Sequence, residues 1–298
     1  MKDTRHETRD TKYETQNIAS LLTPQVKRIL MSHITGLSTA QLLAKPNLQL
    51  TEEQQKWFDE AVIRLQNNEP IQHILGYTTF YGREFKCDRR ALIPRPETEE
   101  LVDWIINDCS TLNFIANGSK TFGSQLSTLN LLDIGTGTGC IALSLAKELT
   151  NTEVTALDIS EEALSLAREN AELLETKNVD FIKGDILNKT FNSQLSTFNF
   201  IVSNPPYVRE CEKVDMEANV LDYDPHTALF VSNDDPLIFY SAIAEFGLEH
   251  LAPNGALYFE INQYLGQETC DLLIALGYKN VELRKDINDN PRMIKALL

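Results

Sequence analysis

Hydrophobic residues recur at helical spacing near the start of the chain. Val26, Ile29 and Leu30 form one such group. A second follows Thr51 and Gln54, whose spacing is that of a capping box at the start of a helix. The apolar positions behind this cap share one helical face: Trp57, Ala61, Val62 and Leu65. The pattern predicts helices that pack through their apolar faces.

The periodicity then changes. Tyr, Thr and Phe residues surround Gly82 and predict a short hairpin, which we treat as a linker near residues 77–96. We therefore divide the chain into a small helical domain, residues 1–85, and a larger domain, residues 86–298. Residues 1–15 are rich in charge and threonine, so we expect them to be disordered.

The larger domain alternates short apolar runs with helical patterns, which is typical of a doubly wound α/β fold with a parallel sheet and crossover helices. The predicted strands are residues 131–134, 153–158, 179–183, 200–203, 256–261 and one near Val281. The predicted helices are residues 97–107, 140–149, 161–174 and 236–251. Residues 110–130 are dominated by Ser, Thr, Asn and Gly and predict a loop. Ligands of such folds bind at the carboxyl ends of the strands.

Three glycines follow the first predicted strand: Gly135, Gly137 and Gly139, interleaved with Thr136 and Thr138. Glycines here allow a tight turn and a close approach of the backbone to a ligand. In a dinucleotide-binding loop the third glycine would stand one place later, where this chain has Cys140. The spacing favours a nucleoside-type cofactor without a pyrophosphate.

Acidic residues follow the next two strands. Asp158 ends the second strand and is placed to accept hydrogen bonds from both ribose hydroxyls of a nucleoside. Asp185 follows the third strand and would accept from an adenine amino group, while Ile186 packs against the ring. A glycine-rich turn or a helix-capping aspartate that occurs by itself commonly has a purely structural role. Together, at successive strand ends, these residues predict an adenosine site.

The fourth strand ends in Asn204, Pro205, Pro206 and Tyr207. Proline has no backbone N–H, so Pro205 presents its carbonyl as a pure acceptor. If the Asn204 side-chain oxygen and this carbonyl each accept one N–H of a substrate NH2 group, they orient a nitrogen that is otherwise a poor nucleophile. Tyr207 would pack over the flat substrate group. The alternative is an ordinary strand-ending turn, which the preceding glycine loop makes less attractive.

Composition narrows the function classes. The 298 residues carry 43 acidic and 27 basic side chains, a formal charge of -16, which disfavours nucleic acid as a partner. The five cysteines are odd in number and form no CxxC pair, and the five histidines show no triad or metal-ligand spacing. No apolar run is long enough to span a membrane. We expect a cytoplasmic protein, monomeric, without a metal.

The sequence resembles the peptide chain release factor N(5)-glutamine methyltransferases, a family of class I S-adenosylmethionine (SAM)-dependent enzymes. Four segments carry the resemblance: Pro70-Ile-Gln-His-Ile-Leu-Gly76, Ile93-Pro-Arg-Pro-Glu-Thr-Glu99, the glycine loop from Asp133 to Gly139, and the tetrapeptide from Asn204 to Tyr207. The similarity runs from about Val26 to the C-terminus. The chain departs from the family in a longer 110–130 segment, in residues 230–235, which lack glycines, and before Val26.

The resemblance implies methylation of the glutamine in the Gly-Gly-Gln motif of release factors, with SAM as cofactor. It places Gly135 to Gly139 and Asp158 at the cofactor, and Asn204 to Tyr207 at the substrate amide, Asn204 bordering both. It also assigns residues 26–75 to release-factor binding, and Arg95 and Glu97 to the surround of the active site or to an ion pair.

Other functions remain open from the sequence. An N(6)-adenine methyltransferase could use the same tetrapeptide on a flipped base, but it would need a basic recognition surface. A SAM-binding adaptor without catalysis is a second alternative, against which the intact tetrapeptide argues. A nicotinamide dehydrogenase is disfavoured by the glycine spacing.

Overall fold

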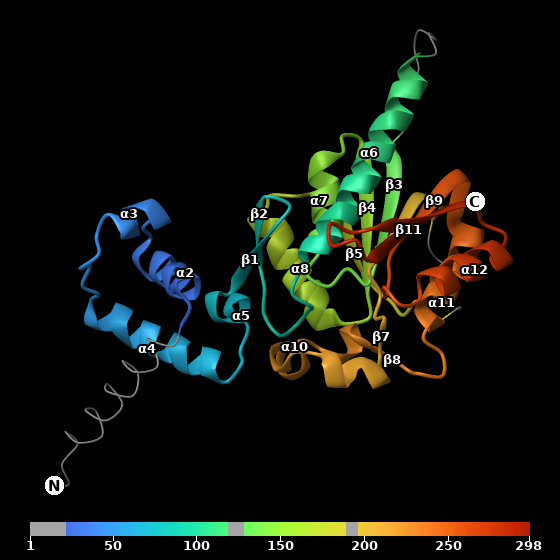
Figure 1. Cartoon of the computed structure of the whole chain (residues 1–298). Helices are drawn as coiled ribbons and strands as arrows, with labels where there is room; N and C mark the ends of the chain where they lie inside the picture. Colours follow the sequence, from blue (N-terminus) through green and yellow to red (C-terminus); the bar gives the residue numbers. More distant parts are fainter. Residues whose placement is uncertain (1–21, 119–127, 189–195) are drawn as a thin grey trace. The chain divides into compact units, whose positions relative to one another are not determined.

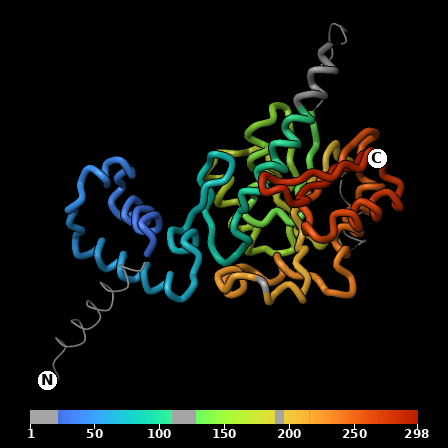
Figure 2. The backbone as a smooth tube through the Cα atoms, in the orientation of Figure 1, coloured from blue at the N-terminus to red at the C-terminus, as the bar shows by residue number. Residues whose placement is uncertain are grey.

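The computed structural model describes residues 22–118, 128–188 and 196–298 (Figures 1 and 2). Its contacts divide the chain into two compact units. One contains the described residues up to Gly76 together with Ala218–Tyr223, and the other contains Tyr77–Glu217 and Asp224–Leu298. The predicted disordered start, residues 1–15, lies outside the described ranges. Within those ranges, no helix is long and apolar enough to cross a membrane.

The first unit is helical, as its periodicity predicts. Its helices are α2 (Pro24–Thr35), α3 (Thr39–Leu43), α4 (Glu52–Gln66), α5 (Ile71–Leu75) and α10 (Ala218–Tyr223). The capping box is confirmed at α4, where the Gln54 N–H donates to Thr51 Oγ1 at 3.2 Å and the Thr51 N–H to Gln54 Oε1 at 3.0 Å. A small buried core holds the unit together: Leu30, Phe58, Ala61, Val62 and Ile74.

Helix α10 comes from a distant part of the sequence. Its last residue, Tyr223, donates a hydrogen bond from its hydroxyl to the Asn67 carbonyl at 2.8 Å, and its ring lies 6.5 Å from that of His73. No local pattern predicts this helix, because it has only six residues and buries none of them. The helical unit is therefore built from two separate stretches of chain.

The second unit begins with the predicted hairpin, β1 (Tyr77–Phe80) and β2 (Arg83–Lys86). Phe80 pairs with Arg83, which leaves a two-residue turn. Both turn residues have positive φ, +49° at Tyr81 and +69° at Gly82, as the tightest hairpin turns require. Gly82 thus has the role that its position suggested. Buried Phe80 and Phe85 fix the hairpin to the main core.

A seven-stranded sheet forms the centre of this unit. Its strands are β3 (Leu129–Ile134), β4 (Thr152–Asp158), β5 (Val179–Lys183), β6 (Phe198–Ser203), β9 (Leu251–Glu260), β10 (Lys279–Lys285) and β11 (Pro291–Leu297). They are ordered β10-β11-β9-β6-β3-β4-β5. All pairs from β9 to β5 are parallel, whereas β11 is antiparallel to both neighbours. The predicted all-parallel sheet is thus wrong at one end, where the unpredicted β11 inserts between β9 and β10.

Helices cover both faces of the sheet (Figure 1). They are α6 (Pro96–Gly118), α7 (Cys140–Glu148), α8 (Glu161–Leu173), α11 (Ile238–His250) and α12 (Gly266–Leu276). Alternate strand residues enter two separate cores: Leu131 packs with α6 and α7, and Leu132 packs with α11 and α12. This two-sided burial explains why the parallel strands are continuously apolar.

Helix α6 is longer than the sequence analysis predicts. It continues to Gly118, so residues 110–118 are helical and the predicted loop begins too early. In the sequence, Cys109, Leu112 and Ile115 recur every three residues, a helical spacing that is obscured by the Ser, Thr and Asn residues between them, which favour loops. Residues 119–127 of the predicted loop lie outside the described ranges. Helix α12 was not predicted either.

Short elements follow β6. They are β7 (Val208–Arg209), the 3-10 helices η1 (Glu210–Asp215) and η2 (His226–Ala228), and β8 (Phe230–Val231). β7 and β8 form a two-stranded parallel pair. They bring residues around Phe230 back to the end of β6.

Candidate active site

The chain reverses its direction of winding between β3 and β6. β3 is followed by β4 and β5 on one side of the sheet, while β6 is followed by β9 on the other. The crossovers therefore diverge and leave a crevice at the carboxyl ends of β3 and β6, which is where open α/β sheets bind ligands. The glycine loop follows β3, and the Asn-Pro-Pro-Tyr segment follows β6.

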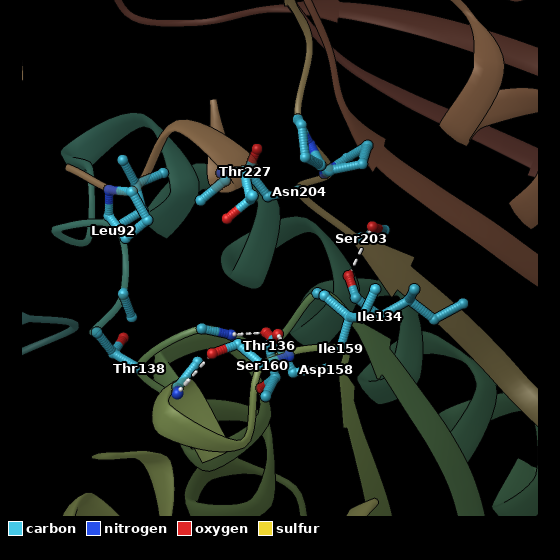
Figure 3. Close-up of a pocket in the computed structure, with 18 of the residues that line it drawn as sticks. Leu92, Ile134, Thr136, Thr138, Asp158, Ile159, Ser160, Ser203, Asn204 and Thr227 are labelled. Carbon is cyan, nitrogen blue, oxygen red and sulfur yellow. Dashed lines mark hydrogen bonds between the residues drawn. The ribbon is translucent and has the colours of Figure 1, made fainter. Parts of the chain in front are cut away.

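A cavity of about 510 Å³ occupies this crevice. Ten of the residues predicted from the sequence line it: Gly135, Thr136, Gly137, Thr138, Asp158, Asp185, Ile186, Asn204, Pro205 and Pro206. Figure 3 shows Thr136 and Asp158 on one side of the open space and Asn204 on the opposite side. The cavity thus brings the two predicted constellations together. Gly139 and Tyr207 do not line it.

Two glycines of the loop have different tasks. Gly137, with φ of +56°, faces the cavity, and a Cβ there would lie 3.8 Å from the Cβ of Ala91, another lining residue. Gly139, with φ of +81°, is the N-cap residue that precedes α7 and faces inward, where a Cβ would lie 3.0 Å from Leu143 Cδ1 and 3.2 Å from Ala167 Cβ. Gly139 therefore permits close packing of α7 on α8 and does not contact the cavity.

Asp158 stabilises the loop from the neighbouring strand. Its Oδ2 accepts the Gly137 N–H and its Oδ1 the Ser160 N–H, both at 2.9 Å. Each carboxylate oxygen has a second lone pair, so the group retains acceptor capacity toward the cavity. Burial raises the pKa of Asp158, and the backbone N–H donors oppose this shift.

Asp185 and Ile186 lie beyond β5 at the same cavity. Asp185 Oδ1 accepts the Leu187 N–H at 2.9 Å, which closes a turn. Ile186 is buried and belongs to the core beneath α11 and α12. Its packing against the sheet fixes the apolar surface that it presents to the cavity.

Asp133 is buried beneath the glycine loop. Its Oδ2 accepts from Thr136 Oγ1 at 2.6 Å and from the Ala142 N–H at 3.2 Å, which joins the loop to α7. Burial raises the pKa of this carboxyl to about 7. Its other oxygen, Oδ1, has no hydrogen-bond partner among the described residues.

The Asn204 amide is held from one side only. Its Nδ2 donates to Thr98 Oγ1 of α6 at 3.3 Å. Its Oδ1 is buried and has no hydrogen-bond partner among the described residues. A buried amide oxygen without a donor is unfavourable by roughly 1–3 kcal/mol, so it marks a site where a ligand donor can be accepted.

Tyr207 does not line the cavity. Its hydroxyl donates to Glu260 Oε1 at 3.1 Å, and its ring packs against the core beneath α11 and α12. Burial is the main reason that its pKa is raised. Its backbone carbonyl accepts from Asn262 Nδ2 at 2.9 Å. The structure thus places Tyr207 as an anchor of the tetrapeptide.

Sequence reasoning missed several residues of this site. Residues 89–95 and Thr98 line the cavity, although only Arg95 and Glu97 of this stretch were singled out. Arg95 Nη2 donates to buried Asp224 Oδ2 at 2.7 Å, so the expected ion pair exists and its partner is now identified. Glu97 does not line the cavity. Thr98 lies inside the quoted Pro-Arg-Pro-Glu-Thr-Glu motif and could have been found, whereas nothing in the sequence marks Asp224.

Comparisons with known proteins agree with this geometry. The family described as "Methyltransferase domain" matches residues 125–296, and the "PrmC N-terminal domain" matches residues 24–76. A release factor glutamine methyltransferase of Flavobacterium psychrophilum is 46% identical over 268 residues, covering 90% of this chain and 89% of the relative. One from Bacteroides thetaiotaomicron is 41% identical over 292 residues, covering 97% and 99%.

A solved structure supports the fold alone. The 16S rRNA methyltransferase of T. thermophilus, solved with AdoMet and guanosine, superposes with a TM-score of 0.50 at 15% identity and covers 74% of this chain and 49% of that one. The sequence relatives support a more specific family assignment, because they are similar over nearly the whole chain. Because these two relatives are 46% and 41% identical and cover 90% and 97% of this chain, the chain belongs to the release factor glutamine methyltransferase family.

Proposed function

We propose that this protein transfers a methyl group from SAM to the side-chain amide nitrogen of the glutamine in the Gly-Gly-Gln motif of peptide chain release factors. One observation carries the proposal: the buried Asn204 Oδ1 has no donor among the described residues, while the nitrogen of the same amide is tethered at the wall of the cavity. The names of the relatives supply the substrate class.

The cavity residues suit SAM as cofactor. Gly137 leaves space where a side chain would enter the cavity, and Asp158 retains acceptor sites for two hydroxyl groups. Asp185 and Ile186 provide a polar and an apolar surface at the same cavity, as an adenine ring needs. When bound, SAM supplies an electrophilic methyl group on a sulfonium centre.

The opposite wall suits a primary amide. An amide NH2 has two donors, and the Asn204 Oδ1 and the Pro205 carbonyl are acceptors next to each other in the chain. Two acceptors hold the NH2 in a fixed plane, and alignment of this kind provides much of the rate enhancement when the methyl donor is already reactive. The tetrapeptide needs no nucleophilic side chain for this task.

The helical domain at the front of the chain, residues 1–85 in our division, is proposed to bind the release factor. Its match to the PrmC N-terminal domain supports this role. We propose a monomer that acts in the cytoplasm, in keeping with five cysteines that are all free. The net charge of -16 supports a protein substrate over a nucleic acid.

Methyl transfer from labelled SAM tests the proposal. We expect label on a release factor, none on the same factor with Gln→Ala in its Gly-Gly-Gln motif, and none on an adenine-containing duplex. Asn204→Ala should lower kcat by about 100-fold or more, because the amide loses an alignment contact. Label on adenine would show that the substrate is a nucleic acid and not a release factor. SAM binding without methyl transfer to any acceptor would favour a non-catalytic adaptor.

A further inference from the structure

A buried carboxylate lies behind the Asn204 amide. Glu260 is the last residue of β9, the strand next to β6, and is only 1% exposed. Each of its oxygens accepts one hydroxyl group. Thr98 Oγ1 donates to Oε2 at 2.6 Å, and the Tyr207 hydroxyl donates to Oε1 at 3.1 Å. Glu260 thus contacts one residue of α6 and one of the tetrapeptide without lining the cavity.

The hydrogen bond to Glu260 determines what Thr98 can offer to Asn204. A threonine hydroxyl has one proton, and here the Glu260 carboxylate accepts it. The Thr98 oxygen can then only accept, so it must face the nitrogen of the Asn204 amide. This leaves Asn204 Oδ1 as the atom without a partner. The direction of the two hydrogen bonds therefore fixes which end of the amide is free.

The opposite orientation would abolish the acceptor. If the Thr98 proton pointed to Asn204, the amide oxygen would accept it and Nδ2 would become the free atom. A free NH2 cannot accept a donor from a substrate amide. An ionised carboxylate excludes this arrangement, because it has no proton to give to Thr98.

The hydrogen-bond partners of Glu260 and the charge of Arg292 act against the effect of its burial. Burial raises the pKa of the Glu260 carboxyl, while Thr98, Arg292 and Tyr207 oppose that shift. Glu97 of α6 is the nearby charge that disfavours ionisation. Burying a carboxylate is energetically unfavourable because the charge loses its hydration. A glutamine at this position would fill the same space without that cost. Its presence points to a need for two acceptors on one side chain.

We propose that Glu260 is a positioning residue that acts through Thr98 to hold the Asn204 amide with its oxygen free, and through Tyr207 to anchor the end of the tetrapeptide. This inference rests on the proposed function for its catalytic meaning. Its structural content, the orientation of one amide, can be measured without catalysis.

Three substitutions test the relay. Thr98→Val keeps the side-chain shape and removes the hydroxyl, whereas Thr98→Ser keeps the hydroxyl. Glu260→Gln keeps the size but presents an NH2 to one of the two hydroxyls. Thr269→Val is a matched control, because Thr269 is equally buried and also loses a hydroxyl hydrogen bond, to the Leu265 carbonyl, but lies on α12 and does not line the cavity.

Steady-state methylation of a release factor is the first readout. Thr98→Val and Glu260→Gln should lower kcat by about 10- to 100-fold, as a misplaced aligning group does. The Kd of SAM, measured by calorimetry, should change by less than about threefold, because neither Thr98 nor Glu260 is among the residues that we assign to the cofactor. Thr98→Ser should recover most of the lost kcat. Equal losses in Thr98→Val and Thr269→Val would show a general packing effect and overturn the inference.

Hydrogen exchange of the Asn204 side-chain NH2 is the second readout. Its NMR signal is identified by its absence in Asn204→Ala. The hydrogen bond to Thr98 should protect it, and exchange should be roughly tenfold faster in Thr98→Val and in Glu260→Gln but not in Thr269→Val. Unchanged exchange in both relay variants would overturn the inference.

The two proposals fail separately. Absence of methyl transfer by the unmodified protein would refute the proposed function, while the exchange measurement would still decide the orientation of the amide. Full activity in Glu260→Gln, together with loss in Asn204→Ala, would leave the function intact and refute the role of Glu260.

Discussion

Alanine at Gly139 and at Gly137 should have different consequences, although the two glycines stand two residues apart. Both have positive φ, which is unfavourable for alanine by about 1–2 kcal/mol. At Gly139 the new methyl would also meet Leu143 at 3.0 Å and Ala167 at 3.2 Å, and overpacking of this kind adds about 1–3 kcal/mol. We expect Gly139→Ala to lower the free energy of unfolding by about 2–5 kcal/mol and Gly137→Ala by about 1–2 kcal/mol.

Ligand affinity should show the reverse order. The Gly137→Ala methyl enters the cavity wall near Ala91, so it should weaken SAM binding while the fold is largely kept. Gly139 does not line the cavity, so folded Gly139→Ala should bind SAM with nearly normal affinity. Urea unfolding and calorimetric titration of both variants measure the two effects. Equal destabilisation, or a larger loss of affinity in Gly139→Ala, would refute the assignment of one glycine to packing and the other to the ligand.

Two further predictions concern the acidic residues of the site. Asp158→Asn should weaken SAM binding by about 10- to 200-fold in a calorimetric titration, since one charge-assisted hydrogen bond contributes roughly 1.5–3 kcal/mol; a change below about threefold would remove Asp158 from the cofactor. The pKa of Asp133, ordinarily 3.8, is about 7 in the folded protein because of burial. The unfolded chain therefore loses this proton at lower pH than the folded protein does. The protonated Asp133 carboxyl contributes up to roughly 4 kcal/mol to the free energy of unfolding below about pH 4, and this contribution is lost as the pH rises to about 7. Urea unfolding across this pH range should show Asp133→Asn becoming more stable relative to the unmodified protein as the pH rises. If the difference between their free energies of unfolding does not depend on pH, Asp133 is not a buried carboxyl that binds a proton.

The predicted site residues that line the cavity have a common origin. In a parallel sheet, the carboxyl ends of neighbouring strands meet at one edge, so residues directly after β3, β4, β5 and β6 converge whatever their separation in sequence. Gly137, Asp158, Asp185 and Asn204 all follow this rule and all line one cavity. Local periodicity was also sufficient for the hairpin around Gly82 and for the capped helix α4.

What the sequence does not predict depends on long-range contacts. Glu260 ends a strand like the others, but its significance lies in hydroxyl partners from α6 and the tetrapeptide, which no spacing reveals. The aromatic ring of Tyr207 suggests stacking on a substrate, yet its hydroxyl donates a hydrogen bond to the buried Glu260 carboxylate. Buried polar groups need such partners, and the sequence does not show which residue provides one. β11 was missed because its seven residues contain two basic side chains and its burial comes from lying between two other strands.

The insertion of β11 between β9 and β10 has a consequence for biosynthesis. Of the sheet's strands, β11 is made last, yet it separates two strands that are made earlier. Until residues 291–297 leave the ribosome, β9 presents a bare row of backbone donors and acceptors, which is the kind of edge that invites pairing with another nascent chain. A stop codon before β11 should therefore yield aggregation instead of a soluble enzyme, because the sheet is complete only after every one of its other strands has been made.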